Sequence, residues 1–126
     1  MTNEFVLEAI TREFPDSVIS HSEPYDLLTL EIKKDDIKKV IHYLRDSSLE
    51  INFLTDICGI HYPESPAKEI GVIYHLHNMM TNFRIRLKAF MPKENAEVDS
   101  MTDLYAGANW MERETFEFYG IKFKGH

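Results

Sequence analysis

The chain has 126 residues, 44% of them hydrophobic, and a formal net charge of −7. This length and composition predict a single domain that buries a core without the help of disulfides or metals. The acidic balance argues against nucleic acid as the main partner, and the single cysteine, Cys58, excludes an internal disulfide and a metal cluster bound by this chain's thiolates alone.

The first elements along the chain are predicted to be a helix and two strands. Apolar residues at helical spacing over residues 3–13 predict a short amphipathic helix, with Asn3 as its N-cap. Two strand-like runs follow, 17–21 and 25–32, and Glu23-Pro24 between them predicts a turn.

A second helix and a third strand come next. Asp35 can cap this helix, and charged residues face away from its apolar stripe. The stripe consists of Ile37, Val40, Ile41 and Leu44. Residues 51–61 are apolar and β-branched, which predicts a buried strand, and residues 62–68 contain two prolines, which predict a loop.

The middle of the chain predicts a hairpin. Residues 70–78 and 83–91 alternate between apolar and polar side chains, so each is expected to be a strand with two unlike faces. With the turn at Met80-Thr81, the apolar pairs are Leu76–Ile85, Tyr74–Leu87 and Val72–Ala89, and the polar pairs are His77–Arg84 and His75–Arg86. A slip by one residue would place apolar side chains against charged ones, so the register is well specified. The arginines are expected to keep the histidines neutral.

The last third of the chain predicts a loop, a turn and a final helix. Residues 92–99 are expected to form a polar loop, Ser100 to cap a turn that runs to Tyr105, and Gly107 to precede the helix. The complete order α-β-β-α-β-β-β-α predicts an α+β fold, a two-layer sandwich in which a mixed sheet of about five strands carries helices on one face. No repeat or linker interrupts residues 1–126, so one domain is expected.

The final helix combines the only tryptophan with several charged side chains. At 100° per residue, Glu112 falls inside a broad apolar arc that also includes Phe116 and Phe118, and a carboxylate there needs a partner. Arg84 or Arg86 of the sheet is the expected partner. The opposite side of the helix carries Trp110, Arg113, Glu114 and Glu117. On that side, Arg113 and Glu117 have the spacing of an ion pair.

Two charged surfaces each have two interpretations. The outward side of the final helix is either the solvated face of a closing helix or a docking surface for another protein, formed by Trp110, Glu114 and Glu117. A stripe of three cations on the sheet is either a solvated face or a contact with an acidic partner or with this chain's own glutamates. These cations are Arg84, Arg86 and Lys88.

Few residues have the spacing that catalysis or metal binding requires. His75 and His77 form an H-x-H pair that would suit a small metal-dependent hydrolase, but a zinc site needs three or four ligands and the neighbouring arginines repel cations. Cys58 and His61 lack an orienting group and an oxyanion hole. The patterns therefore favour an interaction or scaffold subunit over an enzyme with its own active site.

Several segments resemble one known family. Residues 108–126 resemble the 30-kDa-type (C) subunit of proton-pumping NADH:quinone oxidoreductase, which is respiratory complex I. The residues that match its motif are Glu112, Arg113, Glu114, Glu117, Gly120, Ile121, Gly125 and His126. Residues 54–63 resemble the family's Leu-Thr-Asp…Asp-Tyr-Pro stretch, with His61 where an aspartate is usual. Residues 72–76 and 84–88 resemble its Tyr-His-Leu and Arg-Leu-Arg-Val-Lys strands.

The resemblance implies a subunit without catalytic residues or bound cofactors in the peripheral arm of this electron-transport complex. Its expected partners are the 49-kDa-type (D) subunit, beside the quinone-reducing module, and neighbouring cluster-bearing subunits. The residues expected to dock or to maintain the motif are Trp110, Glu112, Arg113, Glu114, Glu117, Gly120, His126, Arg84 and Arg86. An equivalent subunit of a related membrane-bound hydrogenase or dehydrogenase is the alternative.

The resemblance also implies a location and a longer parent chain. The expected place is the cytoplasmic side of the bacterial inner membrane, reached through the complex. The sequence shows neither an apolar run of the ~20 residues that span a bilayer nor a targeting peptide at its start. The family continues beyond the position of His126, so truncation at the C-terminus is expected.

Overall fold

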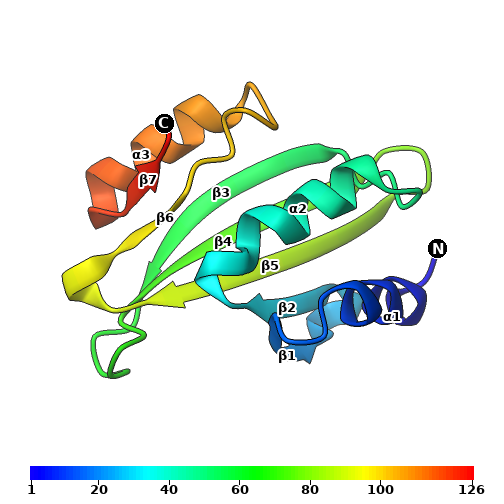
Figure 1. The fold of residues 1–126 in the computed structure, drawn as a ribbon, viewed down its shortest axis with the longest axis horizontal. Coiled ribbons are helices and arrows are strands. Elements are labelled where there is room, and N and C mark those ends of the chain that lie inside the picture. The colour runs from blue at the N-terminus through cyan, green and yellow to red at the C-terminus, as the bar shows by residue number, and fades with distance from the viewer.

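The computed structural model describes all of residues 1–126 as three helices and seven strands, joined by turns and short 3₁₀ segments (Figure 1). The helices are α1 (Asn3–Glu13), α2 (Ile37–Asp46) and α3 (Ala108–Tyr119). The strands are β1 (Val18–Ser22), β2 (Leu28–Ile32), β3 (Phe53–His61), β4 (Ile70–Asn78), β5 (Phe83–Met91), β6 (Glu97–Asp99) and β7 (Lys122–Lys124).

Five of the strands form one mixed sheet in the order β1-β2-β5-β4-β3. Only β2 and β5 pair in parallel, and the other neighbours are antiparallel. In Figure 1, α2 crosses the near face of the sheet, α1 lies beside β1 and β2, and α3 runs along β3. The α+β fold, with a mixed five-stranded sheet and helices on one face, is therefore confirmed.

The register of the central hairpin is the one that the alternation predicts. Tyr74 lies opposite Leu87 and His75 lies opposite Arg86. The side chains that face the helices, such as Tyr74 and Leu87, are completely buried, whereas His75 and Arg86 on the other face are half-buried. The register holds because a slip would bury the charged face.

The second layer is built by amphipathic helices. All four residues of the predicted α2 stripe are completely buried, and Val6 and Ile10 of α1 join the same core. Each such aliphatic side chain removed from water contributes about 1.5–3 kcal/mol before the entropic cost of folding. The stripe therefore fixes which side of α2 contacts the sheet.

The structure corrects two predicted caps. Thr2, not Asn3, caps α1, because its Oγ1 accepts a hydrogen bond from the Phe5 amide. Asp35 lies in a 3₁₀ turn, and α2 begins one residue after Asp36. The side-chain amide of Asn3 instead donates hydrogen bonds to the turn between β1 and β2. A local sequence pattern does not predict this long-range contact.

The predicted loop over residues 92–99 also contains a short strand. β6 pairs in parallel with β7, so Val98 lies opposite Phe123. The two strands flank α3 in the chain and form a separate two-stranded sheet. This pairing brings together the segments that precede and follow α3. Strands of three residues are too short to be predicted from a sequence pattern.

Helix α3 approaches the sheet closely at one glycine. A Cβ atom added to Gly59 of β3 would lie 2.4 Å from Cδ2 of Tyr119 on the last turn of α3. No real Cβ tolerates that distance, so the tyrosine ring can lie over this strand only because residue 59 has no side chain.

We expect Gly59→Ala to lower the free energy of unfolding by about 1–3 kcal/mol, because the new methyl group must displace the Tyr119 ring. Chemical denaturation followed by circular dichroism measures the change. Gly107→Ala is the matched control, since its Cβ would meet only Met111 Cε, at 3.9 Å. The control should change stability by no more than about 0.5 kcal/mol. Equal effects of the two substitutions would contradict the close approach.

Candidate partner-docking site

The C-terminal helix is defined by glycines at both ends. Gly107 precedes its first turn, as predicted, and Gly120 ends it in the left-handed conformation with φ of 70°. The Gly120 amide donates a hydrogen bond to the Phe116 carbonyl. Glycine suits this position because a side chain would strain the left-handed backbone.

Glu112 is the buried centre of the site. Its side chain is completely buried, as its place in the apolar arc predicts. One carboxylate oxygen accepts hydrogen bonds from Ser100 Oγ at 2.7 Å and from His126 Nδ1 at 2.8 Å. The other oxygen accepts one from the Met101 amide at 2.6 Å. Because a carboxylate only accepts, this contact requires the hydrogen of His126 on Nδ1.

The predicted pairing of Glu112 with Arg84 or Arg86 is wrong. Both arginines alternate with buried residues of β5, such as Ile85, and so point to the face of the sheet that carries no helix. Hydroxyl, amide and imidazole donors satisfy the carboxylate instead, which offsets its desolvation cost. They come from the segment before α3 and from the residues after β7.

These bonds connect three segments that are separated in sequence. Ser100 also accepts a hydrogen bond from the Thr102 amide at 3.1 Å, which agrees with its predicted role at the start of a turn. Its own amide donates to the Lys124 carbonyl at 2.8 Å. Glu112 therefore anchors α3 to both β6 and β7 through their flanking residues.

Large apolar side chains are exposed on the outward side of α3 and on both of its flanks. Trp110 is 65% exposed, Phe116 52% and Phe118 80%. The charged side chains Arg113, Glu114 and Glu117 are exposed among them. We call these six residues the α3 surface. Arg113 and Glu117 form no ion pair, although their spacing would permit one.

The buried side of α3 is narrower than the predicted apolar arc. Only Ala108, Glu112 and Thr115 of this helix are buried, and Phe116 and Phe118 lie outside that strip. A helical wheel drawn from the sequence could not predict the width of the buried strip, because that width depends on how far the sheet extends beneath the helix. Here α3 lies along the edge strand β3.

Two small hollows flank the α3 surface. One, of about 250 Å³, lies against β7 and is lined by Glu112, Arg113, Phe116, Lys122, Phe123 and His126. The other, of about 190 Å³, lies between α3 and β3 and includes Cys58, Glu114 and Phe118. Burial raises the pKa of the Cys58 thiol, and the nearby Asp56 adds to the effect, so the reactive thiolate is disfavoured.

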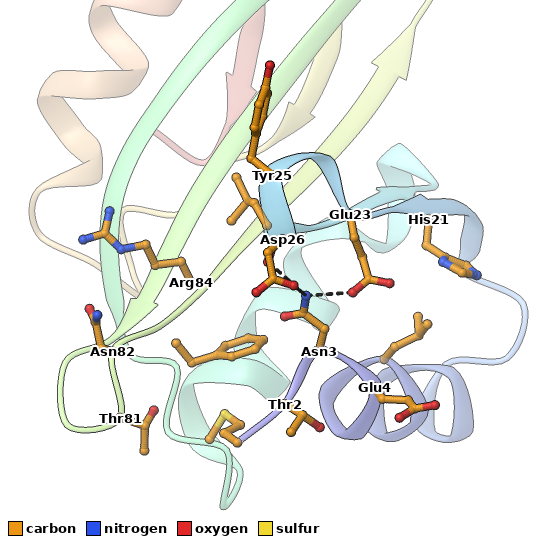
Figure 2. Close-up of a pocket in the computed structure, with 14 residues that line it drawn as sticks. Thr2, Asn3, Glu4, His21, Glu23, Tyr25, Asp26, Thr81, Asn82 and Arg84 are labelled. Atoms are coloured by element: carbon orange, nitrogen blue, oxygen red, sulfur yellow. Dashed lines mark hydrogen bonds between the residues drawn. The ribbon is translucent and has the colours of Figure 1, made fainter.

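A wider hollow, of about 920 Å³, lies at another part of the molecule (Figure 2). It lies between the start of α1, the β1–β2 turn and the β4–β5 turn, and Arg84 is at its edge. Asn3 Nδ2 donates hydrogen bonds to Glu23 Oε1 at 2.8 Å and to the Asp26 carbonyl at 3.0 Å. The Tyr25 side chain in this turn is fully exposed, and its backbone is in the left-handed region with φ of 52°.

The H-x-H pair does not form a metal site. His75 Nε2 accepts a hydrogen bond from Arg86 Nε at 3.0 Å. His77 Nε2 donates a hydrogen bond to Asn82 Oδ1 at 2.8 Å. Burial and the Arg86 charge lower the pKa of His75, so this ring stays neutral as predicted. No group of three or more His, Cys, Asp or Glu side chains is placed to bind a metal ion.

Residues 30–126 match the family described as "Respiratory-chain NADH dehydrogenase, 30 Kd subunit". The chain is 39% identical over 118 residues to the C subunit of NADH-quinone oxidoreductase from Azorhizobium caulinodans, covering 93% of this chain and 55% of that protein. It is 38% identical over 128 residues to the protein of the same name from Roseiflexus sp. (strain RS-1), covering 100% of this chain and 72% of that protein. The chain thus spans about half the length of the first relative.

Two solved structures have a similar fold. The trypsin-resistant fragment (1–134) of Nqo5 has a TM-score of 0.85 and 25% identity, covering 100% of this chain and 98% of the fragment. A chain of the membrane-bound sulfane sulfur reductase, an archaeal respiratory membrane complex, has a TM-score of 0.82 and 21% identity, covering 98% of this chain and 71% of that chain. The second likeness concerns the fold alone.

We expect Glu112→Ala to lower the free energy of unfolding by about 3 kcal/mol, because it leaves the Met101 amide and the Ser100 hydroxyl without their buried acceptor. Glu112→Gln should cost only about 1 kcal/mol. Its oxygen can still accept from the Met101 amide, and its NH₂ group can donate to Ser100 Oγ and to His126 Nδ1 once that ring changes tautomer. Urea denaturation measures both values, and equal losses would show that hydrogen bonding is not what stabilises this centre.

Proposed function

Because this chain belongs to the family of the 30-kDa subunit of respiratory-chain NADH dehydrogenase, we propose that it is a non-catalytic subunit in the peripheral arm of NADH:quinone oxidoreductase. In this role it joins the quinone-reducing module by binding the 49-kDa-type subunit, on the cytoplasmic side of the bacterial inner membrane. None of its three helices has the length and apolarity that crossing a membrane requires.

The observation that carries the proposal is the exposure of Trp110, Phe116 and Phe118 on one rigid helix. Aromatic side chains are enriched at the centres of protein interfaces, where Trp and Tyr often contribute most of the binding energy. Leaving three of them in water on one helix costs free energy that a partner surface would recover.

The rest of the α3 surface fits the outer part of such an interface. Arg113, Glu114 and Glu117 are exposed and unpaired, so their charges are free to meet groups of a partner. The Glu112 hydrogen bonds keep the helix in one position before binding. A surface ordered in advance loses less conformational entropy on association, which favours a permanent contact between subunits.

The candidate catalytic groups support a structural role. The Cys58 thiol is held in its less reactive form, and His75 is engaged with Arg86. Glu112 uses its carboxylate to connect segments of the chain. In this proposal, electron transfer and quinone chemistry take place on other subunits.

The alternative, an equivalent subunit of a related membrane-bound hydrogenase or dehydrogenase, would use the same docking helix. The fold shared with a chain of the archaeal sulfane sulfur reductase is what keeps this alternative open. Affinity purification from the native membrane separates the two, because the co-purifying catalytic subunits differ in their cofactors.

We expect Trp110→Ala and Phe118→Ala each to weaken the binding of the purified 49-kDa-type subunit by about 30-fold or more, because each removes an exposed aromatic anchor. Titration calorimetry measures the dissociation constants. Tyr25→Ala is the matched control. It removes an aromatic side chain that is even more exposed, on the β1–β2 turn away from α3. Its affinity should stay within about twofold of the unmodified chain.

Removing the Arg113 charge from the same helix should reduce assembly of the complex without changing its catalytic turnover. We expect Arg113→Ala to lower the amount of complex that contains this chain, while each assembled complex keeps its NADH:quinone turnover. Native gels and activity per assembled complex measure the two quantities. Normal assembly by Trp110→Ala, Phe118→Ala and Arg113→Ala together would refute the docking role of α3.

A further inference from the structure

A second surface of the molecule is covered by no helix. It carries positive charge, although the whole chain is acidic. The face of the sheet that carries no helix presents Arg84, Arg86 and Lys88 from β5. These three residues are the basic stripe. His75 and His77 of β4 lie directly opposite the two arginines on the same face.

The basic stripe has no carboxylate partner within the chain. No Asp or Glu oxygen lies within 4.0 Å of the charged nitrogens of Arg84, Arg86 or Lys88. Two carboxylates lie on the same face of the sheet without forming an ion pair with the stripe. Glu31 pairs with Lys68 at 2.7 Å, and Asp56 lies opposite His75 on the edge strand β3. Three neighbouring cations thus stay unpaired in a chain with a net charge of −7.

Arg86, the central residue of the stripe, is oriented so that its guanidinium can bind a carboxylate. Arg86 donates its Nε hydrogen to His75 Nε2 at 3.0 Å, and no other hydrogen bond engages its guanidinium. Both terminal nitrogens remain free, and they form the parallel pair of donors that binds a carboxylate in bidentate fashion. Because His75 is fixed on the neighbouring strand, it orients the guanidinium before any partner arrives.

Apolar side chains lie beside the charges on the same face. Ile73 and Phe90 are half-buried there, and no helix covers them. The Phe90 ring has Lys68 Nζ at 5.1 Å and Lys88 Nζ at 6.0 Å from its centroid. A partner that covered this face would therefore bury apolar surface as well as neutralise charge, the usual composition of an interface.

We propose that this uncovered sheet face binds an acidic segment of a partner protein through Arg84, Arg86 and Lys88. Alternate residues of a strand are about 6.6–6.8 Å apart, so the three cations form a straight row. Carboxylates on alternate residues of an extended segment repeat at the same distance and match this row. Since β5 is a central strand, the contact uses side chains and not an added strand.

This surface is separate from the α3 surface and does not depend on it. The 49-kDa-type subunit, or any other partner, could occupy α3 while an acidic segment occupies the sheet face. Variants of the two surfaces therefore distinguish the failure of this proposal from the failure of the proposed function.

The test uses two synthetic extended peptides, one with glutamates at four alternate positions and one with glutamines at the same positions. We expect the glutamate peptide to bind the chain and the glutamine peptide not to bind, by titration calorimetry and by NMR shifts of β4 and β5. The triple variant Arg84→Glu, Arg86→Glu, Lys88→Glu should lose at least about tenfold in affinity. Arg86→Lys keeps the charge but lacks the fork of donors, and should lose about threefold or more.

The matched control reverses three exposed cations that also lack ion pairs but lie elsewhere, in the variant Arg12→Glu, Lys33→Glu, Lys93→Glu. Its net charge equals that of the test variant, and its affinity for the glutamate peptide should stay within about threefold of the unmodified chain. Circular dichroism checks that each variant is folded, and Arg86→Lys provides the test should the triple variant unfold.

Three results would overturn the proposal. The first is an equal loss of affinity in the control variant, since that would mean unspecific attraction. The second is unchanged affinity in the folded test variant. The third is binding of duplex DNA or of phosphatidylserine vesicles through the same three residues as tightly as the glutamate peptide, which would assign the stripe to phosphate in place of carboxylate.

Discussion

The hydrogen bonds of one buried carboxylate decide how the C-terminal third of this chain is arranged. The side chain of Glu112 is completely buried, so its oxygens need hydrogen-bond donors from the protein to offset the cost of burial. The donors come from Ser100, Met101 and His126. Any movement of α3 relative to these residues would break several short bonds together. The exposed aromatic side chains of the helix consequently have a fixed orientation relative to β6 and β7.

Features that depend on local alternation could be predicted from the sequence, and those that depend on distant donors could not. The hairpin register follows from apolar and charged residues two apart, so the His75–Arg86 pair was predictable. The burial of Glu112 followed from its helical position, yet its partners did not, because a backbone amide and a hydroxyl leave no charge pattern. The exposure of Phe118 was missed because the edge position of β3 under α3 is a property of sheet order.

The two faces of the five-stranded sheet differ in what covers them and in the side chains they carry. One face carries the helices and the apolar core, and it presents α3 as an aromatic surface at its edge. The other remains open and carries cations that the chain itself does not neutralise. The chain belongs to a family of respiratory-chain subunits, and its α3 surface and its open sheet face lie on different parts of the molecule.

The parallel pairing of β2 with β5 has a consequence for the order in which the chain folds. Leu28 lies beside Ile85, and α2, β3 and β4 intervene in the chain. During synthesis, the β1–β2 hairpin therefore emerges with an open edge that stays unpaired until β5 is made. The local β3–β4–β5 meander can form as soon as it is complete, whereas the parallel junction must close a long loop. Until that junction closes, the open edge of β2 is available for wrong pairing.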